Sequence, residues 1–364
     1  MNEQERILCV LNRKEPDKTP WFADLSYLYK SMEVKGTLSR KFKNEEGYLE
    51  FHKELGAGIC FYAPFPWSST YTNKIQHNIQ VKKNIQITEY MTSLGNISCE
   101  ERFLPETFSW AITKHYINSI DDLRIMTFIH ENTIYSKNFT EFSRISNLWG
   151  NHGIAAAFPS ISSAPLQKLL ARWAGIENTV NIYMDHGDEF ETLLNKIDIA
   201  ESPIFDILCD STCEYVEFAE NLSSEVTGAT FFQQFNMPHY QKRNKQLHDA
   251  GKFTGIHIDG TLKPCLSMLF KCGFDVAEAV TPFPIGDIHI KDLRKEAGED
   301  LIIWGGLPGV LFSPLYPEGQ FRAHLNELLE VFSPGSNFIL GVADQVPPDG
   351  LLSRIKYVRE VLGN

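Results

Sequence analysis

Short apolar runs alternate with amphipathic segments along most of the chain. Eight runs have the length and apolar content of buried strands, and most of the segments between them repeat apolar residues at helical spacing. The eight runs are TPWFADLS at 19–26, GAGICFY at 56–62, GIAAAFP at 153–159, IFDILCDS at 204–211, FTGIHIDG at 253–260, DVAEAVT at 275–281, LIIWGG at 301–306 and NFILGVAD at 337–344. Strands that alternate with helices indicate a parallel sheet, and eight such units predict an α/β fold of the (β/α)8 TIM-barrel type.

One segment breaks this alternation. From Pro66 to Phe103 apolar and polar residues alternate with a period of two, which is typical of antiparallel hairpins. We expect a β-hairpin-rich insertion after the second strand, spanning about 66–150 within a single domain that covers residues 1–364. In a barrel such an insertion lies at the carboxyl ends of the strands, where it can wall or cover a site.

Charge and composition exclude several classes of protein. The net charge is −12 and no dense block of Lys or Arg occurs, so a nucleic-acid surface is not expected. The chain has no apolar run of membrane-spanning length, and its N-terminus does not read as a signal peptide, which predicts a soluble, cytoplasmic protein. Its seven cysteines form no CxxC pair, so neither a disulfide framework nor a zinc finger is indicated. The oligomeric state is left open, a homodimer included.

Polar residues gather where the predicted strands end, which is where barrel enzymes place their active sites. These residues are Asp24, Tyr62, Asp210, His257 with Asp259, Glu278 and Asp344. Several carboxylates at one rim exceed what stability needs, because an unpaired buried carboxylate costs several kcal/mol. The rim therefore looks functional as a set.

His257 and Asp259 stand two residues apart on one strand, so their side chains point to the same side. With Glu278 and Asp344 they offer the donors that zinc or another divalent ion takes in a catalytic site. The alternative is structural: Asp259 caps a helix that begins near Thr261, and His257 is a hydrogen-bonded core histidine.

The other acidic residues also have structural alternatives. Asp349 is the better cap for the last helix, which leaves Asp344 without a capping role. Asp210 is followed by Ser211, so substrate contact and helix capping are both open for it. For Asp24 a functional role is modestly favoured over helix capping, because the nearby Ser26 can cap the helix that follows.

These segments, taken together, resemble the uroporphyrinogen decarboxylase-like superfamily over nearly the whole length of the chain. The resemblance rests on ERILCVLNRKEPDKTPW, PLQKLLARWAGIENTVNIYMD, FNMPHYQKRNKQLHDAGKFTGIHIDG, GFDVAEAVTPFPIGD, WGGLPG and LGVADQVPPDG. It implies a (β/α)8 barrel. The stretches WFADLSYLYK and ICFYAPFPWS lack the arginines and the aspartate that bind the tetrapyrrole in true uroporphyrinogen decarboxylases, so porphyrinogen decarboxylation is not expected.

The resemblance also implies a chemistry. Thiol-methylating members hold zinc with a His-x-Cys motif and a late cysteine, and this chain has His257-Ile258-Asp259 and Asp344 at those positions. Carboxylates suit the polarisation of an oxygen better than the activation of a thiol. The chain is thus similar to methyltransferases that pass a methyl group from a methoxylated or similar small donor to the cobalt of a corrinoid protein.

In that interpretation the metal, expected to be zinc, is held by His257, Glu278 and Asp344, with Asp259 as a ligand or a catalytic residue beside Asp210. Rim residues including Asp24, Tyr27, Tyr62 and Trp67 would bind the substrate, although core packing is the alternative for each aromatic ring. Two other functions stay open: a decarboxylase or other lyase acting on a small carboxylic acid, and a binding module without turnover.

Overall fold

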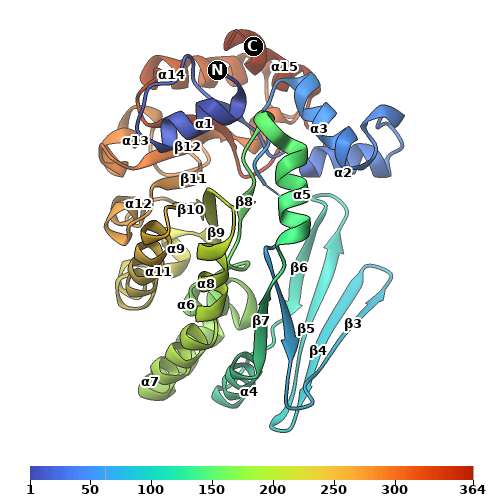
Figure 1. Cartoon of the computed structure of the whole chain (residues 1–364), viewed down its shortest axis with the longest axis vertical. Coiled ribbons are helices and arrows are strands. Elements are labelled where there is room, and N and C mark those ends of the chain that lie inside the picture. Colours follow the sequence, from blue (N-terminus) through green and yellow to red (C-terminus); the bar gives the residue numbers. More distant parts are fainter. Residues whose placement is uncertain (62, 364) are drawn as a thin grey trace.

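The computed structural model describes residues 1–61 and 63–363 and has a parallel β-sheet at its centre (Figure 1). Seven strands hydrogen-bond in the order β1-β13-β12-β11-β10-β9-β8. Their bounds are β1 (Trp21–Phe22), β8 (Ala156–Ala157), β9 (Tyr215–Leu222), β10 (Phe253–Ile258), β11 (Val276–Val280), β12 (Ile302–Pro308) and β13 (Phe338–Ala343). All the pairings in this sheet are parallel, so the carboxyl ends of its strands share one edge.

Residues 58–60 join the two ends of this sheet. The amide of Gly58 donates to the carbonyl of Trp21 in β1 at 2.9 Å. On the other side, the amides of Ile154 and Ala156 donate to the carbonyls of Ile59 and Cys60 at 3.1 and 3.0 Å. The predicted second strand thus occupies the eighth place around the sheet, as isolated bridges instead of a continuous ladder.

One predicted strand is wrong. Residues 204–211 do not form a strand, because Ser202–Asp210 is helix α8, with Pro203 in its first turn. Its apolar residues Ile204, Phe205, Ile207 and Leu208 are buried at helical spacing. The strand follows as β9, whose sequence YVEFAENL carries two buried glutamates and therefore looks too polar for a core strand.

Helices cover the outside of the sheet (Figure 1). Their bounds are α1 (Glu3–Leu11), α2 (Ser26–Val34), α3 (Asn44–Leu55), α4 (Ile120–Glu131), α5 (Phe139–Trp149), α6 (Pro165–Lys168), α7 (Gly175–Ala200), α8 (Ser202–Asp210), α9 (Ser224–Thr227), α10 (Ala229–Phe231), α11 (Met237–Asp249), α12 (Leu266–Leu269), α13 (Ile290–Ala297), α14 (Glu318–Val331) and α15 (Leu352–Val361). Among the described residues, none of these helices is both long and apolar enough to cross a bilayer.

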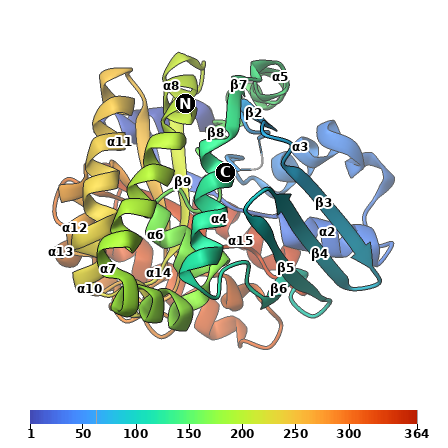
Figure 2. The ribbon, with the colours of Figure 1, turned by 90° about the horizontal axis from the view of Figure 1, so that it is seen from below.

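Antiparallel strands lie between the second and third positions of the sheet in chain order. β2 (Trp67–Tyr71) pairs with β7 (Thr133–Lys137), and a four-stranded sheet runs in the order β3 (Gln76–Lys82), β4 (Ile85–Thr92), β5 (Gly95–Leu104) and β6 (Ser109–Lys114). Figure 2 shows β3–β6 side by side next to α4. Ile97 of β5 packs in one buried cluster with Leu123 of α4 and Leu193 of α7, which holds this sheet against the helices.

Large side chains fill the barrel below the strand ends. The ring of Trp304 lies 5.6 Å from that of Phe22 and 6.0 Å from that of Tyr215, and all three side chains are almost fully buried. Ile7 of α1 belongs to the same buried cluster. The open space of the barrel is therefore restricted to the edge where the strands end.

Candidate active site

A cavity of about 440 Å³ lies at the carboxyl ends of the parallel strands. Its lining combines a polar end with an apolar wall and comprises Asp24, Phe61, Ala63, Pro64, Phe65, Phe158, Ile161, Glu217, Ala219, Asn221, His257, Glu278, Asp344 and Gln345. A concave apolar space with a few converging polar groups is the usual form of a small-molecule site. No Lys or Arg lines it among the residues that the structure describes.

His257 and Glu278 form the tightest contact at the polar end. The two residues are in register on neighbouring strands β10 and β11, and His257 Nδ1 lies 2.5 Å from Glu278 Oε2. Burial alone lowers the pKa of His257, but the charge of Glu278 and its hydrogen bond outweigh burial and raise this pKa to about 10. In the metal-free protein His257 is therefore an imidazolium at neutral pH.

Asp344 reaches the opposite side of the same imidazole. Its Oδ1 lies 3.9 Å from His257 Nε2, and its backbone has a φ of +68° directly after β13. The left-handed region is uncommon for a residue with a Cβ, although aspartate tolerates it better than most. Burial raises the pKa of Asp344, the charge of His257 lowers it in part, and the charges of Asp259 and Glu278 raise it.

Glu217 on β9 is a member of the site that sequence reasoning missed. Its side chain is almost fully buried, its Oε2 accepts a hydrogen bond from the hydroxyl of Tyr215, and its Oε1 is buried with no partner among the described residues. Burial raises the pKa of Glu217 well above its usual range, and the charge of Glu278 adds to this rise. The signal that could have found Glu217 is its position two residues after Tyr215 in YVEFA, the part of β9 that is otherwise apolar.

Gly255 makes room for the contact between Tyr215 and Glu217. A Cβ on Gly255, which pairs with Glu217 across β9 and β10, would lie 1.8 Å from the Tyr215 hydroxyl oxygen and 2.6 Å from Glu217 Oε2. No side chain fits there without displacing the pair. The first glycine of GIHIDG thus shapes the floor of the cavity.

Phenylalanine rings form the apolar wall. The ring of Phe158 lies 6.5 Å from that of Phe61 and 6.4 Å from that of Phe65. Trp67 packs at 5.0 Å from Phe65 and donates from Nε1 to the carbonyl of Phe158 at 3.1 Å, behind this wall. The three phenylalanine rings are inclined to one another and together give the cavity an apolar wall.

The other predicted substrate-binding residues are distributed around the rim. Asp24 lines the cavity, and its carboxylate accepts a hydrogen bond from the amide of Ser26, so Asp24 and not Ser26 supports the start of α2. Tyr27 is half-buried, and its pKa is raised by burial and then by Asp344 and Asp24. Tyr62 lies outside the described residues.

Asp259 does not line the cavity. Its side chain is exposed, and its amide donates to the carbonyl of Leu222. It does not cap the following turn either, because the amides of Leu262 and Lys263 donate to the carboxylate of Asp287. It acts on the site through its negative charge, which raises the pKa of Asp344.

Asp210 does not stand at the end of a barrel strand, because the run at 204–211 forms helix α8 instead of a strand. It is the last residue of α8, and its exposed carboxylate pairs with Lys137 at 2.8 Å. It does not line the cavity at the strand ends. The structure therefore places Asp210 at the surface, at the end of helix α8, and not at a strand end as the sequence predicted.

The donors at the polar end fit a divalent cation in part. Within residues 1–61 and 63–363, no three or more His, Cys, Asp and Glu side chains are grouped closely enough to hold a metal ion. His257 Nε2 and Asp344 Oδ1 nevertheless face each other across 3.9 Å, and Glu278 bonds to the other ring nitrogen. A carboxylate in that position usually orients a metal-binding imidazole. The partnerless Oε1 of Glu217 is a further buried acceptor on the same cavity.

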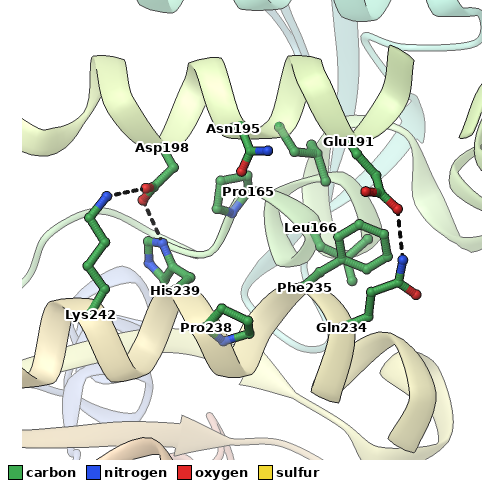
Figure 3. Close-up of a pocket in the computed structure, with 11 residues that line it drawn as sticks. Pro165, Leu166, Glu191, Asn195, Asp198, Gln234, Phe235, Pro238, His239 and Lys242 are labelled. Carbon is green, nitrogen blue, oxygen red and sulfur yellow. Dashed lines mark hydrogen bonds and ion pairs between the residues drawn. The ribbon is translucent and has the colours of Figure 1, made fainter. Parts of the chain in front are cut away.

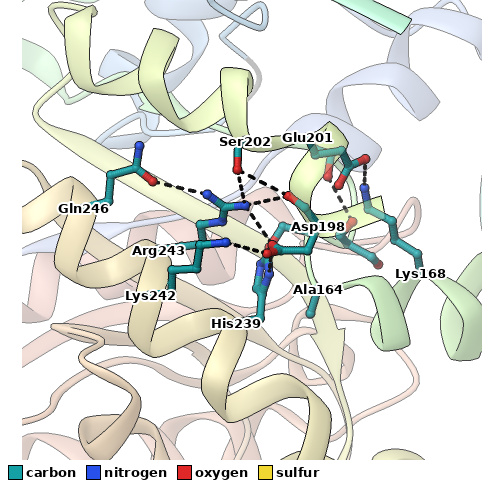
Figure 4. Close-up of polar contacts among 12 residues, drawn as sticks. Ala164, Lys168, Asp198, Glu201, Ser202, His239, Lys242, Arg243 and Gln246 are labelled. Carbon is teal, nitrogen blue, oxygen red and sulfur yellow. Dashed lines mark hydrogen bonds and ion pairs between the residues drawn. The ribbon is translucent and has the colours of Figure 1, made fainter. Parts of the chain in front are cut away.

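A second cavity, of about 330 Å³, lies between α7 and α11 and belongs to a structural network. Figure 3 shows Lys242 and His239 of α11 reaching Asp198 of α7 across it. Asp198 also accepts from Arg243 at 2.8 Å (Figure 4), so one carboxylate ties the two helices together. Burial raises the pKa of Asp198, but these three partners outweigh it and hold the pKa well below its usual range.

The parallel sheet, its covering helices and a polar cavity at the strand ends define a barrel protein with its site in the place usual for barrel enzymes. The family model for uroporphyrinogen decarboxylase (URO-D) matches residues 162–363, more than half of the chain, and the chain belongs to this family. The matched part contains Glu217, His257, Glu278 and Asp344.

Solved structures confirm the fold. A methyltransferase from Methanosarcina mazei superposes over 100% of both chains with a TM-score of 0.64, at 15% sequence identity. Among curated proteins none matches the chain in sequence. Likeness at this identity concerns the fold, so the reaction has to be argued from the site.

Proposed function

We propose that the protein is a metal-dependent methyltransferase that moves a methyl group from a methoxylated aromatic compound to the cobalt of a corrinoid protein. The observation that carries this proposal is the division of the cavity into a wall of phenylalanine rings and an end with His257, Asp344 and Glu217. A methoxyarene has the same division, because a flat apolar ring carries a single ether oxygen. The absence of Lys and Arg from the described lining disfavours a tetrapyrrole with many carboxylates.

The chain's own residues have separate roles in this proposal. Phe61, Phe65 and Phe158 hold the ring, and Glu278 fixes the orientation of His257 through Nδ1. His257 Nε2 and Asp344 would hold a divalent ion, expected to be zinc, which polarises the ether oxygen when bound. Asp259, exposed nearby, contributes negative charge without a contact.

The methyl transfer requires one proton, which the departing oxygen takes up. The bond between the methyl carbon and the oxygen breaks, its electron pair stays on the oxygen, and the carbon forms a bond with cobalt(I) of the corrinoid. Glu217 has a raised pKa and a partnerless Oε1 on the cavity, so it can hold a proton there and give it to the departing oxygen as a phenol forms.

A decarboxylase or other lyase is the second candidate. The raised pKa of His257 favours it, because an imidazolium on the cavity can protonate the carbanion that remains after carbon dioxide leaves. A binding module without turnover is the third candidate.

One assay separates the three. Zinc-loaded protein is incubated with a panel of methoxybenzenes, with and without a cobalt(I) corrinoid protein, and the phenol and methylcobalt products are followed. We expect equal amounts of both products only with the corrinoid protein, and none with His257→Ala. Turnover that needs no corrinoid and releases carbon dioxide from an acid would establish the lyase, and binding without any product would establish the binding module.

A further inference from the structure

A third cavity, of about 280 Å³, lies between the antiparallel strands and the barrel; we call it the sheet-side cavity. Its lining includes Tyr71 of β2, Tyr90 of β4 and Tyr135 of β7, together with Lys168 and Trp173. Ile161 lines both this cavity and the one at the strand ends. The two spaces are therefore neighbours with different linings.

Lys168 is a buried cation with unused hydrogen-bonding capacity. Its side chain is 4% exposed and its ammonium bonds to Glu201, as Figure 4 shows. An ammonium has three donors, and within the described residues the Lys168 ammonium bonds to one acceptor, Glu201. A buried donor without a partner is costly, so an acceptor oxygen in the cavity would stabilise Lys168.

Glu201 does not satisfy all the hydrogen-bond donors of the Lys168 ammonium. The carboxylate of Glu201 also lies 3.2 Å from His130 Nδ1, so its charge is shared between two partners. Burial raises the pKa of Glu201, but the charges and hydrogen bonds of Lys168 and His130 outweigh burial and lower it to about 2. The ion pair of Lys168 and Glu201 thus borders the cavity, with the Glu201 carboxylate shared between Lys168 and His130.

The rest of the lining selects a flat ligand. The rings of Tyr71 and Tyr90 lie 5.8 Å apart in an edge-to-face arrangement, and their hydroxyl oxygens are 3.3 Å apart. The Lys168 ammonium lies 5.5 Å from the centre of the Trp173 ring. Aromatic faces with hydroxyl groups favour an aromatic ring, and the small volume limits the ligand to one ring.

We propose that the sheet-side cavity is a second binding site, which takes a single-ring aromatic carboxylate with its carboxylate on Lys168 and its ring against the tyrosine rings. This site is independent of the methyl transfer proposed above, because none of the residues that bind the carboxylate belongs to the polar end at the strand ends.

Benzoate is the probe for this site. Calorimetric titration of the full-length protein should show one benzoate site, with weaker binding of benzamide, which lacks the charge, and of cyclohexanecarboxylate, which lacks the flat ring. The double variant Lys168→Met/Glu201→Gln removes the buried ion pair without leaving a lone charge. Its affinity for benzoate should fall by about 10-fold or more, as expected for the loss of a charged hydrogen bond.

Two controls locate the site. Lys242→Met removes a lysine that pairs with Asp198 at another cavity, and His257→Ala alters the cavity at the strand ends; neither should change benzoate affinity. Nuclear Overhauser contacts from benzoate should reach the rings of Tyr90 and Tyr135 and not those of Phe61 and Phe158, which provides a test without substitution. Loss of binding in His257→Ala, contacts to the phenylalanines, or no binding at millimolar benzoate would overturn the proposal.

Discussion

His257 Nδ1 and Glu278 Oε2 lie 2.5 Å apart because parallel pairing places the two residues opposite each other on β10 and β11. Ala279, next to Glu278, has a φ of +60°, and the register of β11 against β12 shifts between Ala277 and Val280. Such irregularities re-aim side chains at the edges of sheets. The contact leaves the second ring nitrogen of His257 for Asp344 or for a ligand.

Replacing Glu278 should therefore change the protonation of His257. In metal-stripped Glu278→Gln protein, the pKa of His257 should fall far below about 10, because the charge and the charged hydrogen bond that raise it are removed while burial remains. A titration of the imidazole by nitrogen-15 NMR measures this shift. The exposed Glu225→Gln is the control, and an unchanged His257 pKa in Glu278→Gln would contradict the assignment.

The same pair predicts a pH-dependent stability. The pKa of His257 is raised from an ordinary value near 6.5 to about 10, so the folded metal-free protein binds an extra proton between these values. The resulting stabilisation is complete below about pH 6.5 and is lost as the pH rises through 10. Denaturant unfolding from pH 6 to 10 should show the stability advantage of wild type over His257→Gln shrinking, and a constant difference would refute the linkage.

Metal binding should depend on His257 and Asp344. Zinc affinity, measured by competition with a chelator, should fall by about 100-fold or more in His257→Ala and by about 10- to 100-fold in Glu278→Gln, whose carboxylate supports the ring. Asp344→Asn should also weaken binding. His248→Ala is the matched control, since His248 pairs with Asp275 outside the cavity. Equal zinc binding in all four variants would rule out this site.

Gly255 should tolerate no side chain. In Gly255→Ala the new Cβ would meet Tyr215 and Glu217 at distances that no relaxed structure allows, so the free energy of unfolding should fall by about 1–3 kcal/mol or more. Gly319→Ala in α14 is the control, because its Cβ would meet nothing within 4 Å and alanine favours helix. Chemical denaturation of both variants measures the difference, and equal stabilities would contradict the packing.

Asp210 should be dispensable for the reaction. Its exposed pair with Lys137 is of a kind that contributes about 1 kcal/mol or less, so Asp210→Asn should leave both stability and turnover nearly unchanged. A steady-state assay beside Asp344→Asn gives the comparison. A large loss of turnover in Asp210→Asn would place this residue back in the mechanism.

The sequence located most of the barrel strands because their apolar runs are buried on both faces. β10, β11 and β13 lie inside the predicted runs, and β12 extends two residues beyond its run. His257, Glu278 and Asp344 line one cavity as their positions at strand ends implied. The run at 204–211 failed as a strand because a short apolar run does not distinguish a buried strand from the buried face of a helix.

The sequence by itself therefore determined the parallel α/β architecture and the edge at which polar residues meet, because periodicity records which positions are buried. Only the tertiary structure decided that Glu278 and Asp344 face different nitrogens of His257, that Glu217 joins them, and that Asp210 and Asp259 do not line the cavity. These relations depend on register, on backbone irregularities such as those at Ala279 and Asp344, and on the space left by Gly255, which arise only when neighbouring strands pack together.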